Sequence, residues 1–509
     1  MKKLPIGIST LKEIIEENYL YVDKTKIALD LIESGKYYFL SRPRRFGKSL
    51  FLDTLRTIFD GEKEIFEGLH IYDKWDFKKY PVIHISFAAG DLKSKEQLYD
   101  KWEEILQYNE EILEISCNTT VYDRRFFSKL MREAYKKYGQ KVVILIDEYD
   151  KPILDNIENT EVAREAREIL KDFYSVIKGS DEYLKFVFIT GVSKFSKVSL
   201  FSGLNNINDI TLDSNYSTIC GYTQNDVETV FAEHLKGQDF EKIKHWYNGY
   251  KWLGEGVYNP FDILLFIQKN YEYRNYWFST ATPTFLLKLI EKNNYFLPDL
   301  ENIVKDERML NSFDVDYIEL ETLMWQTGYL TIDRTETILD TISYYLTIPN
   351  KEVRSLLLGS VADFMSKIQS STAITNGILM ALIKADFPSF EKYIHSLFAA
   401  IPYNLFTKNK LYEYEGYYVS VFYAYMKAFG LEVIGEDVTN KGRIDLTIKL
   451  PQALYIIEFK VDGSSALEQI KAKKYYEKYL SLNLPLYLVG IEFDKADRNV
   501  SLVEWEKLI

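Results

Sequence analysis

The chain has 509 residues, of which 47% are hydrophobic and 27% charged, and its formal net charge is -12. This length exceeds what one hydrophobic core usually serves, and the composition excludes a disordered chain, so we expect two to four globular domains. The acidic balance excludes a broad basic surface, so any contact with DNA or RNA has to use a local basic region.

The distribution of apolar residues and cysteines excludes two further classes. No uninterrupted apolar stretch approaches the roughly 18 residues that cross a bilayer, and the N-terminal MKKLPIGISTLKEIIEE lacks the apolar core of a signal peptide. Cys117 and Cys220 lie far apart without metal-ligand spacing, which excludes a zinc site and a disulfide framework. We therefore expect a cytoplasmic protein with no membrane partner.

The N-terminal part of the chain alternates apolar runs with helical stretches. Runs that are apolar on both faces and separated by helices are typical of buried parallel strands in a βαβ architecture. The runs are YYFL (37–40), VIHISF (82–87), VVILI (142–146) and FVFIT (186–190). They predict an α/β domain with a parallel sheet.

The loop SRPRRFGKS (41–49) connects the first predicted strand to a predicted helix. Gly47 allows phosphate to approach the backbone, Lys48 can reach the β and γ oxygens, and the Ser49 hydroxyl can bind Mg²⁺. Arg42 stands where the pattern G-x-x-x-x-G-K-[ST] has its first Gly. Because GKS also occurs at ordinary helix starts, the loop needs a second motif beside it.

That second motif is VVILIDEYD, which places Asp147 and Glu148 at the carboxyl end of a buried strand. Asp147 can hold the water shell of Mg²⁺, and Glu148 can act as the catalytic residue that orients the attacking water. The alternative is that both acids cap the next helix. With the loop, they predict binding and hydrolysis of ATP with Mg²⁺ as cofactor.

The strand FVFIT ends near hydroxyl and ammonium groups that could read the γ-phosphate. Thr190 and Ser193 are supporting candidates for a sensor, and Lys194 and Lys197 could sense its charge. The alternative is that hydroxyl groups at a strand end only stabilise the fold.

After about residue 215 the pattern becomes mainly helical. Residues 223–235 and 261–269 are predicted as helices, and Thr223 with Asp226 forms a capping arrangement at the first. The helical pattern continues from 280 to 395. Strand character there is confined to 329–332 and 344–348.

Several segments resemble a known family in chain order. They are RPRRFGKS, LIDEYDKP, ITGVSKFSKVSLFSGLNN, WYNGYKW with VYNP, WQTGYLTI and IPNKEV. The chain resembles the bacterial AAA-ATPase-like family, whose members often carry a PD-(D/E)XK nuclease-superfamily domain at the C-terminus. In that family RPRRFGKS is the usual loop, so Arg42 in place of Gly looks like a family trait. The resemblance covers nearly the whole chain.

The loop supplies the predicted nucleotide contacts. The nucleotide-binding candidates are Arg42, Arg44, Arg45, Phe46, Gly47, Lys48, Ser49 and Leu50. The family pattern also places YVDKT (21–25) near the nucleotide, whereas Asp23 or Thr25 could equally cap the following helix.

An α/β alternation returns in the last part of the chain. The predicted order is a helix over 415–429, strands over 444–448 and 454–459, a helix over 465–480 and a strand over 486–491. This order predicts a second α/β domain.

A carboxylate cluster is predicted in that domain. Asp445 lies on one strand, and Glu458 and Lys460 lie on the next, two residues apart and therefore on the same side. Two carboxylates with a backbone carbonyl suit Mg²⁺, or Mn²⁺ in its place. Lys460 could then deprotonate or orient the water that attacks a phosphodiester. The pattern is short, and an exposed hairpin can contain it by chance.

Two neighbouring residues strengthen the pattern. Glu415 lies on the preceding helix, where a further carboxylate could complete the metal site, and Gln469 follows on the next helix. This order resembles the PD-(D/E)XK superfamily. The resemblance implies Glu415, Asp445 and Glu458 as metal ligands, Asp445, Glu458 and Lys460 as catalytic residues and Gln469 as a supporting residue.

Lysines and tyrosines alternate along the predicted helix after Gln469. They are Lys471, Lys473, Lys474, Tyr475, Tyr476, Lys478 and Tyr479. They could track the phosphate backbone of DNA or RNA. The alternative is a solvated helix face whose charge Glu468 and Glu477 partly balance.

The expected fold class is α/β, with an N-terminal P-loop NTPase, a helical middle region and a C-terminal restriction-endonuclease-like domain. The expected boundaries are 1–215 for the ATPase-like domain, 216–285 for a helical lid or winged-helix-like region, 286–395 for a helical coupling region and 396–509 for the nuclease-like domain.

The predicted function is an ATP-binding and ATP-hydrolysing protein that controls a Mg²⁺-dependent nuclease acting on DNA or RNA. The alternative is a nucleotide-switched regulatory protein whose nuclease-like domain binds nucleic acid or protein without cutting it. Because P-loop ATPases of this general kind often act as oligomers, the expected partners also include further copies of the chain.

Overall fold

In a computed structural model the protein is described over residues 1–90, 92–119, 125–194, 206–277, 284–293, 295–301, 303–310, 316, 318–367, 372–401, 415–463 and 465–509. Its contacts form two compact units, Met1–Ala281 with Val304–Asn350, and Thr282–Ile303 with Lys351–Ile509. The predicted four-domain division stays a prediction. No helix in these ranges is both long and apolar enough to pass through a bilayer.

The first unit is built on a parallel five-stranded sheet with the order β2-β3-β4-β1-β5. The strands are β1 (Tyr37–Ser41), β2 (Val82–Ser86), β3 (Val142–Asp147), β4 (Leu184–Gly191) and β5 (Asn208–Asp209). The four predicted apolar runs lie in β1 to β4. Their side chains are mostly buried because helices cover both faces of a parallel sheet.

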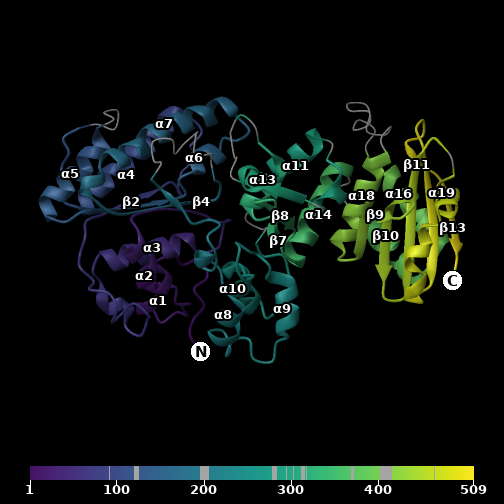
Figure 1. Ribbon diagram of the computed structural model, residues 1–509, viewed down its shortest axis with the longest axis horizontal. Helices are drawn as coiled ribbons and strands as arrows, with labels where there is room; N and C mark the ends of the chain where they lie inside the picture. The colour runs from purple at the N-terminus through teal and green to yellow at the C-terminus, as the bar shows by residue number, and fades with distance from the viewer. Residues whose placement is uncertain are drawn as a thin grey trace. The chain divides into compact units, whose positions relative to one another are not determined.

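Two sets of helices cover this sheet, one on each face (Figure 1). The first set is α1 (Leu11–Glu16), α2 (Thr25–Ser34) and α3 (Lys48–Phe59), and the second is α4 (Lys95–Ile112), α5 (Phe126–Tyr138) and α7 (Thr160–Gly179). A short helix, α6 (Lys151–Leu154), follows β3. This arrangement confirms the predicted α/β fold.

A small helical subregion follows the sheet in sequence. It contains α8 (Gln224–Thr229), α9 (Phe240–Tyr247) and α10 (Pro260–Gln268). Thr223 and Asp226 form the predicted capping box. The predicted helix over 223–235 is too long, because α8 ends at Thr229 and the chain continues in turns. The side chains of Phe231 and Leu235 nevertheless lie in the same hydrophobic core as Val227 of α8. This shared burial explains why the three residues are spaced as in a helix.

The middle of the chain is helical with one small sheet. Its elements are α11 (Thr284–Lys292), β6 (Ile303–Asp306), α12 (Glu307–Leu310), α13 (Leu320–Thr327), β7 (Thr331–Ile338) and β8 (Thr341–Thr347). The three strands form a sheet with the order β6-β8-β7. The two short predicted strands therefore belong to one hairpin, in which β7 and β8 run antiparallel.

The second unit packs helices against a sheet with the order β13-β12-β11-β10-β9. The strands are β9 (Glu432–Thr439), β10 (Gly442–Leu450), β11 (Ala453–Val461), β12 (Leu486–Asp494) and β13 (Asn499–Lys507), and the helices are α14 (Lys351–Ser366), α15 (Thr372–Lys384), α16 (Phe387–Ala399), α18 (Glu415–Ala428) and α19 (Ala466–Lys473). Only β11 and β12 are parallel, and α19 lies between them in sequence.

The sequence prediction missed two strands and one helix break in this unit. β9 and β13 are the sheet's edges, and polar residues interrupt the apolar pattern of both sequences, which weakens the apolar signal. The predicted helix over 465–480 breaks at Lys474, whose φ is 50°, and a 3-10 helix continues over Tyr475–Leu482.

Candidate functional site

The phosphate-binding loop lies between β1 and α3. Gly47 has a φ of 93°, a conformation that glycine adopts without steric cost, and Lys48 begins the helix. The Lys48 ammonium is buried and donates hydrogen bonds to the carbonyl oxygens of Arg42, at 3.0 Å, and Pro43, at 2.9 Å. Burial lowers the pKa of Lys48. The loop's own carbonyls thus hold this lysine at the helix start.

The carboxyl end of β3 meets the same helix start. The Ser49 hydroxyl donates a hydrogen bond to Asp147 Oδ2 at 2.6 Å. Glu148 follows with a φ of 51°, and burial, together with the charge of Asp147, raises its pKa. Ser49 and Asp147 therefore place a hydroxyl and a carboxylate oxygen together, the kind of oxygen donors that Mg²⁺ prefers.

Lys48, Ser49 and Glu148 line a cavity of about 740 Å³, and Asp147 is not among its lining residues. The predicted site residues in its wall are Arg44, Arg45, Gly47, Lys48, Ser49, Leu50 and Glu148. Lys93 and Lys151 also lie in the wall and were not predicted. Other parts of the wall come from the N-terminal segment around Pro5 and from the start of α10 around Pro260.

Arg42 is not among the residues that line this cavity. Its guanidinium is fully buried and donates to the carbonyl oxygens of Ser41, Thr211 and Tyr216, at 2.8, 2.9 and 3.2 Å. It also lies over the ring of Trp252, 4.2 Å from its centroid. These contacts give Arg42 a structural role in the loop, and its predicted part in nucleotide binding stays a prediction.

Phe46 also points away from the large cavity. Its ring packs edge-on against Tyr250 and Trp252, with centroid distances of 4.7 and 5.4 Å. It lines a second, smaller cavity of about 60 Å³, which Leu50 and Tyr222 share. The ring of Phe46 therefore anchors the loop to the YNGYKW segment, and its predicted part in nucleotide binding stays a prediction.

Of the two predicted hydroxyl sensors, Ser193 belongs to a buried clamp around Asp150. Asp150 accepts hydrogen bonds from the backbone N–H groups of Val192 and Ser193, and from the Ser193 hydroxyl at 2.5 Å. Thr190 is buried, and its hydroxyl has no hydrogen-bond partner in the described ranges. Neither Thr190 nor Ser193 is among the residues that line the cavity. The sequence placed Asp150 in the LIDEYD motif but gave it no role.

Of the two predicted charge sensors, Lys194 and Lys197, the structure describes only Lys194. The Lys194 ammonium forms an ion pair with Asp209, and its backbone N–H donates to Gln326 Oε1 at 3.0 Å. Lys197 lies outside the described residues. Lys194 is therefore part of the fold's hydrogen-bonding network.

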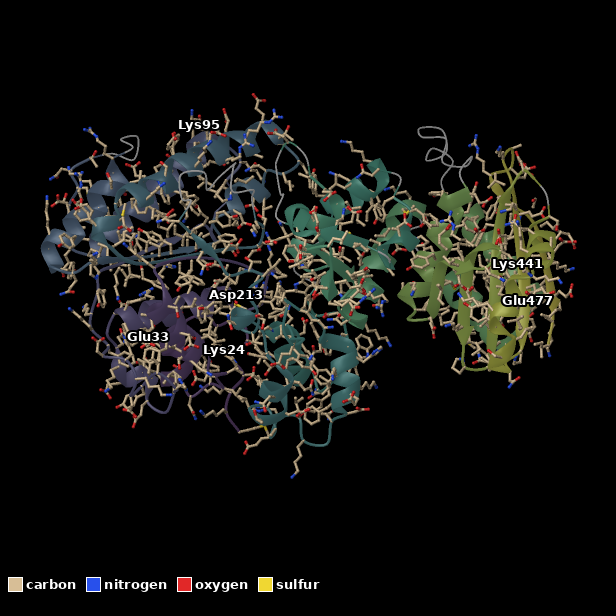
Figure 2. The ribbon with its side chains drawn as sticks, in the orientation of Figure 1. Lys24, Glu33, Lys95, Asp213, Lys441 and Glu477 are labelled. Carbon is tan, nitrogen blue, oxygen red and sulfur yellow. The ribbon has the colours of Figure 1, made fainter. Side chains whose placement is uncertain are left out.

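The YVDKT segment lies beside the small cavity, which Tyr21 and Lys24 line. Asp23 accepts a hydrogen bond from the Thr25 backbone N–H at 2.8 Å, at the start of α2. The Lys24 ammonium, labelled in Figure 2, pairs with Asp226 at 3.0 Å. The segment therefore both stabilises a helix start and ties it to α8.

In the second unit the predicted C-terminal residues meet at one place. Asp445 on β10 accepts a hydrogen bond from the Phe459 backbone N–H of β11 at 2.8 Å. The Lys460 ammonium donates to Glu415 Oε1 at 3.2 Å and to Glu458 Oε1 at 3.4 Å. The Gln469 amide donates to the same oxygen of Glu458. Four of the five predicted residues are thus joined by side-chain hydrogen bonds, and Asp445 is bonded to the backbone between Glu458 and Lys460.

Burial sets the charges in this cluster. It raises the pKa of Glu458 to about 8, with a further contribution from the charge of Asp445, and it raises the pKa of Asp445 to about 6. For Lys460 burial acts in the opposite direction, but the neighbouring carboxylates outweigh it and raise its pKa. Lys460 is therefore an ammonium at neutral pH, which suits orienting a water or stabilising charge rather than deprotonating water.

The cluster offers two carboxylate side chains, those of Asp445 and Glu458, to one divalent cation. Glu458 Oε2 is buried without a hydrogen-bond partner in the described ranges, so it offers a ligand oxygen beside Asp445. Within those ranges, however, no three or more His, Cys, Asp or Glu side chains are grouped as a metal site. Asp445 and Glu458 are thus the pair that would hold the ion, and Glu415 pairs with Lys460.

Tyr475 is a member of the cluster that the sequence did not identify. It is buried, and its pKa is raised by burial and then by the charge of Glu458, while a hydrogen bond with Gln469 lowers it. A Cβ atom at Gly442 would lie 2.9 Å from its hydroxyl oxygen. The helix break at Lys474 directs this ring inward, which a continuous helical pattern did not indicate.

Several charges predicted to track phosphate are paired instead. Lys478 bonds to Asp437, and Lys471 pairs with Glu506 at 2.7 Å. Lys441 and Glu477, which lie side by side in Figure 2, form an ion pair at 2.9 Å. These contacts favour the alternative of a solvated, charge-balanced face.

Comparison with known proteins agrees with the two chemical clusters. The model of the family described as predicted AAA-ATPase matches residues 5–201, and that of the PD-(D/E)XK nuclease superfamily matches residues 413–503. The chain is 47% identical over 506 residues to an "Uncharacterized protein in vnfD 5'region" of Azotobacter chroococcum mcd 1, with 98% of each chain covered. No solved structure matches. The chain belongs to the predicted AAA-ATPase family and carries a C-terminal domain of the PD-(D/E)XK nuclease superfamily.

Proposed function

We propose that the protein binds and hydrolyses ATP, and that this reaction controls a metal-dependent nuclease in its C-terminal domain. The ATPase part is supported above all by the 2.6 Å hydrogen bond between Ser49 and Asp147, beside Lys48 at the wall of a large cavity. Ser49 and Asp147 would hold Mg²⁺, which neutralises charge on the β- and γ-phosphates. Glu148, in the same wall, would orient the attacking water.

The nuclease part is supported by the unpartnered carboxylate oxygen of Glu458. Burial disfavours the charged form of Glu458 and raises its pKa to about 8, and a cation bound beside its unpartnered oxygen would favour the anionic form. Asp445 and Glu458 would hold Mg²⁺ or Mn²⁺, which stabilises negative charge on a phosphodiester of DNA or RNA. The Lys460 ammonium would orient the attacking water, and Gln469 would keep Glu458 in place.

The test measures ATP hydrolysis and nucleic-acid cleavage together on the full chain with Mg²⁺ and with Mn²⁺. We expect Lys48→Ala to abolish hydrolysis and to change cleavage, and Glu458→Ala to abolish cleavage while hydrolysis continues. Folded wild-type protein that cuts neither DNA nor RNA, with or without ATP, would refute the nuclease part. Cleavage unaffected by Lys48→Ala would refute the control by ATP.

A second function is favoured by one observation. The Lys460 ammonium occupies the space between Glu415 and Glu458, and no third carboxylate completes a metal site in the described ranges. The C-terminal domain would then bind nucleic acid or protein without cutting, under the control of the nucleotide. Comparing Lys460→Ala with Lys48→Ala in one biological assay separates the two: a phenotype that survives only Lys460→Ala selects this function.

A further inference from the structure

Five cationic side chains line the large cavity, and most of them are engaged. They are Arg44, Arg45, Lys48, Lys93 and Lys151. Lys48 is bonded to two loop carbonyls. Lys151 is bonded to the Gly90 carbonyl at 3.1 Å and to Asp155. The Arg45 guanidinium lies over the ring of Phe261, 4.8 Å from its centroid.

Arg44 is different. It is exposed, and its guanidinium has no hydrogen-bond or ion-pair partner in the part of the chain that the structure describes. It lines the same cavity as Lys48, Ser49 and Glu148. Arg44 is thus an uncommitted cation in the wall that also holds the residue that would orient the attacking water.

The chain's own middle segment braces the backbone at this point. Gly328 has a φ of 91°, and a Cβ atom there would lie 2.9 Å from the ring of Pro43, the residue before Arg44. Gln326, two residues earlier, binds the Lys194 backbone N–H at 3.0 Å. The loop position that carries Arg44 is therefore fixed by contacts within one chain.

We propose that Arg44 is an intramolecular arginine finger, which binds the γ-phosphate and stabilises the charge of the transition state in the same chain. This inference rests on the proposed ATP hydrolysis. An arginine that contacts the transferring phosphoryl group contributes about 10³–10⁵ in kcat, whether it comes from the same chain or another. Hydrolysis then requires no residue from a second copy.

The bonds formed and broken in this step are those of ordinary hydrolysis. The water oxygen bonds to the γ-phosphorus, and the bond from that phosphorus to the β–γ bridging oxygen breaks, with its electron pair remaining on ADP. Glu148 orients the water and accepts its proton, which ends on the products. Arg44 donates hydrogen bonds to the γ-phosphate oxygens, where negative charge is spread in the transition state.

The experiment compares steady-state hydrolysis and ATP binding for Arg44→Ala, Arg44→Lys and wild type. Arg44→Ala should lower kcat by roughly 10³-fold or more, with ATP affinity changed by less than about tenfold, because the chemical step and not binding is affected. Arg44→Lys should recover part of kcat, and added guanidinium should partly rescue Arg44→Ala. Arg132→Ala, an exposed arginine on α5, is the matched control and should keep wild-type kcat.

Different results would contradict the role of Arg44 and the proposed ATPase function. A kcat for Arg44→Ala within threefold of wild type overturns the inference, and so does activity restored by mixing Arg44→Ala with Glu148→Gln chains, because restoration shows a finger supplied by another chain. Wild-type protein that binds ATP without hydrolysing it refutes the proposed ATPase function instead. Circular dichroism and ATP binding confirm that each variant is folded.

Discussion

The backbone of Gly249 lies against Pro349: a Cβ atom added at Gly249 would lie 2.0 Å from the Pro349 carbonyl oxygen. Gly249 also has a φ of 124°, a backbone conformation that residues with a side chain rarely adopt. The YNGYKW and IPNKEV segments therefore meet through a backbone contact that only glycine permits.

Replacing Gly249 by alanine should destabilise the first unit strongly. The matched control is Gly237→Ala, because Gly237 also has a positive φ, 81°, but has open space around its Cα. We expect the control to lose about 1 kcal/mol from backbone strain and Gly249→Ala to lose at least about 3 kcal/mol, since backbone atoms must also move. Chemical denaturation of both variants measures the difference, and equal losses would contradict the contact.

Replacing Arg42 by the first glycine of the pattern G-x-x-x-x-G-K-[ST] should lower the stability of the folded protein rather than improve its nucleotide site. Arg42→Gly removes the side-chain donor from the buried carbonyl groups of Ser41 and Thr211, each loss costing about 1–3 kcal/mol, and removes the contact with Trp252, whereas the Tyr216 carbonyl keeps the Ile219 N–H as donor. Thermal unfolding should show a large loss for Arg42→Gly. Arg44→Gly, at an exposed position of the same loop, should lose much less. Comparable losses would show that Arg42 is dispensable for folding.

Metal binding should be visible in the stability of the second unit. Mg²⁺ or Mn²⁺ at about 100 times its Kd should stabilise wild type by about 2.7 kcal/mol, and EDTA should remove that gain. The free energy of unfolding of Glu458→Gln should not increase when the metal is added. In EDTA this variant should be at least as stable as wild type, because it no longer buries an unpartnered carboxylate oxygen. Glu477→Gln, an exposed position, should respond like wild type. A metal-dependent gain retained by Glu458→Gln would contradict the assignment.

The Asp150 clamp should couple the strand ends to ATP hydrolysis. Asp150→Asn places an amide where the Val192 and Ser193 N–H groups and the Ser193 hydroxyl all donate, so we expect a loss of about 1–3 kcal/mol and a lower kcat. Asp73→Asn, in an exposed turn, is the control. A lower melting temperature with unchanged kcat would limit Asp150 to a structural role.

The sequence predicted those features that depend on local pattern. The strands β1 to β4 are apolar on both faces, and Glu458 and Lys460 are two residues apart on one strand, so both the sheet and the C-terminal pair could be expected. The burial of Arg42 could not, because its acceptors include carbonyls of Thr211 and Tyr216, far along the chain. Tyr475 was hidden for a similar reason, since the break at Lys474 changes which face it occupies.

The position of Lys460 has a consequence for how a cation enters the C-terminal site. Its ammonium already lies within ion-pair distance of Glu415 and Glu458, so the protein carries its own cation there. Loading the site is then an exchange of one cation for another rather than the filling of an empty space. The apparent affinity for Mg²⁺ therefore reflects the difference between the attraction of the carboxylates for Mg²⁺ and their attraction for the Lys460 ammonium. A substitution that breaks the ion pair between Lys460 and Glu415 would change this affinity while leaving Asp445 and Glu458 intact.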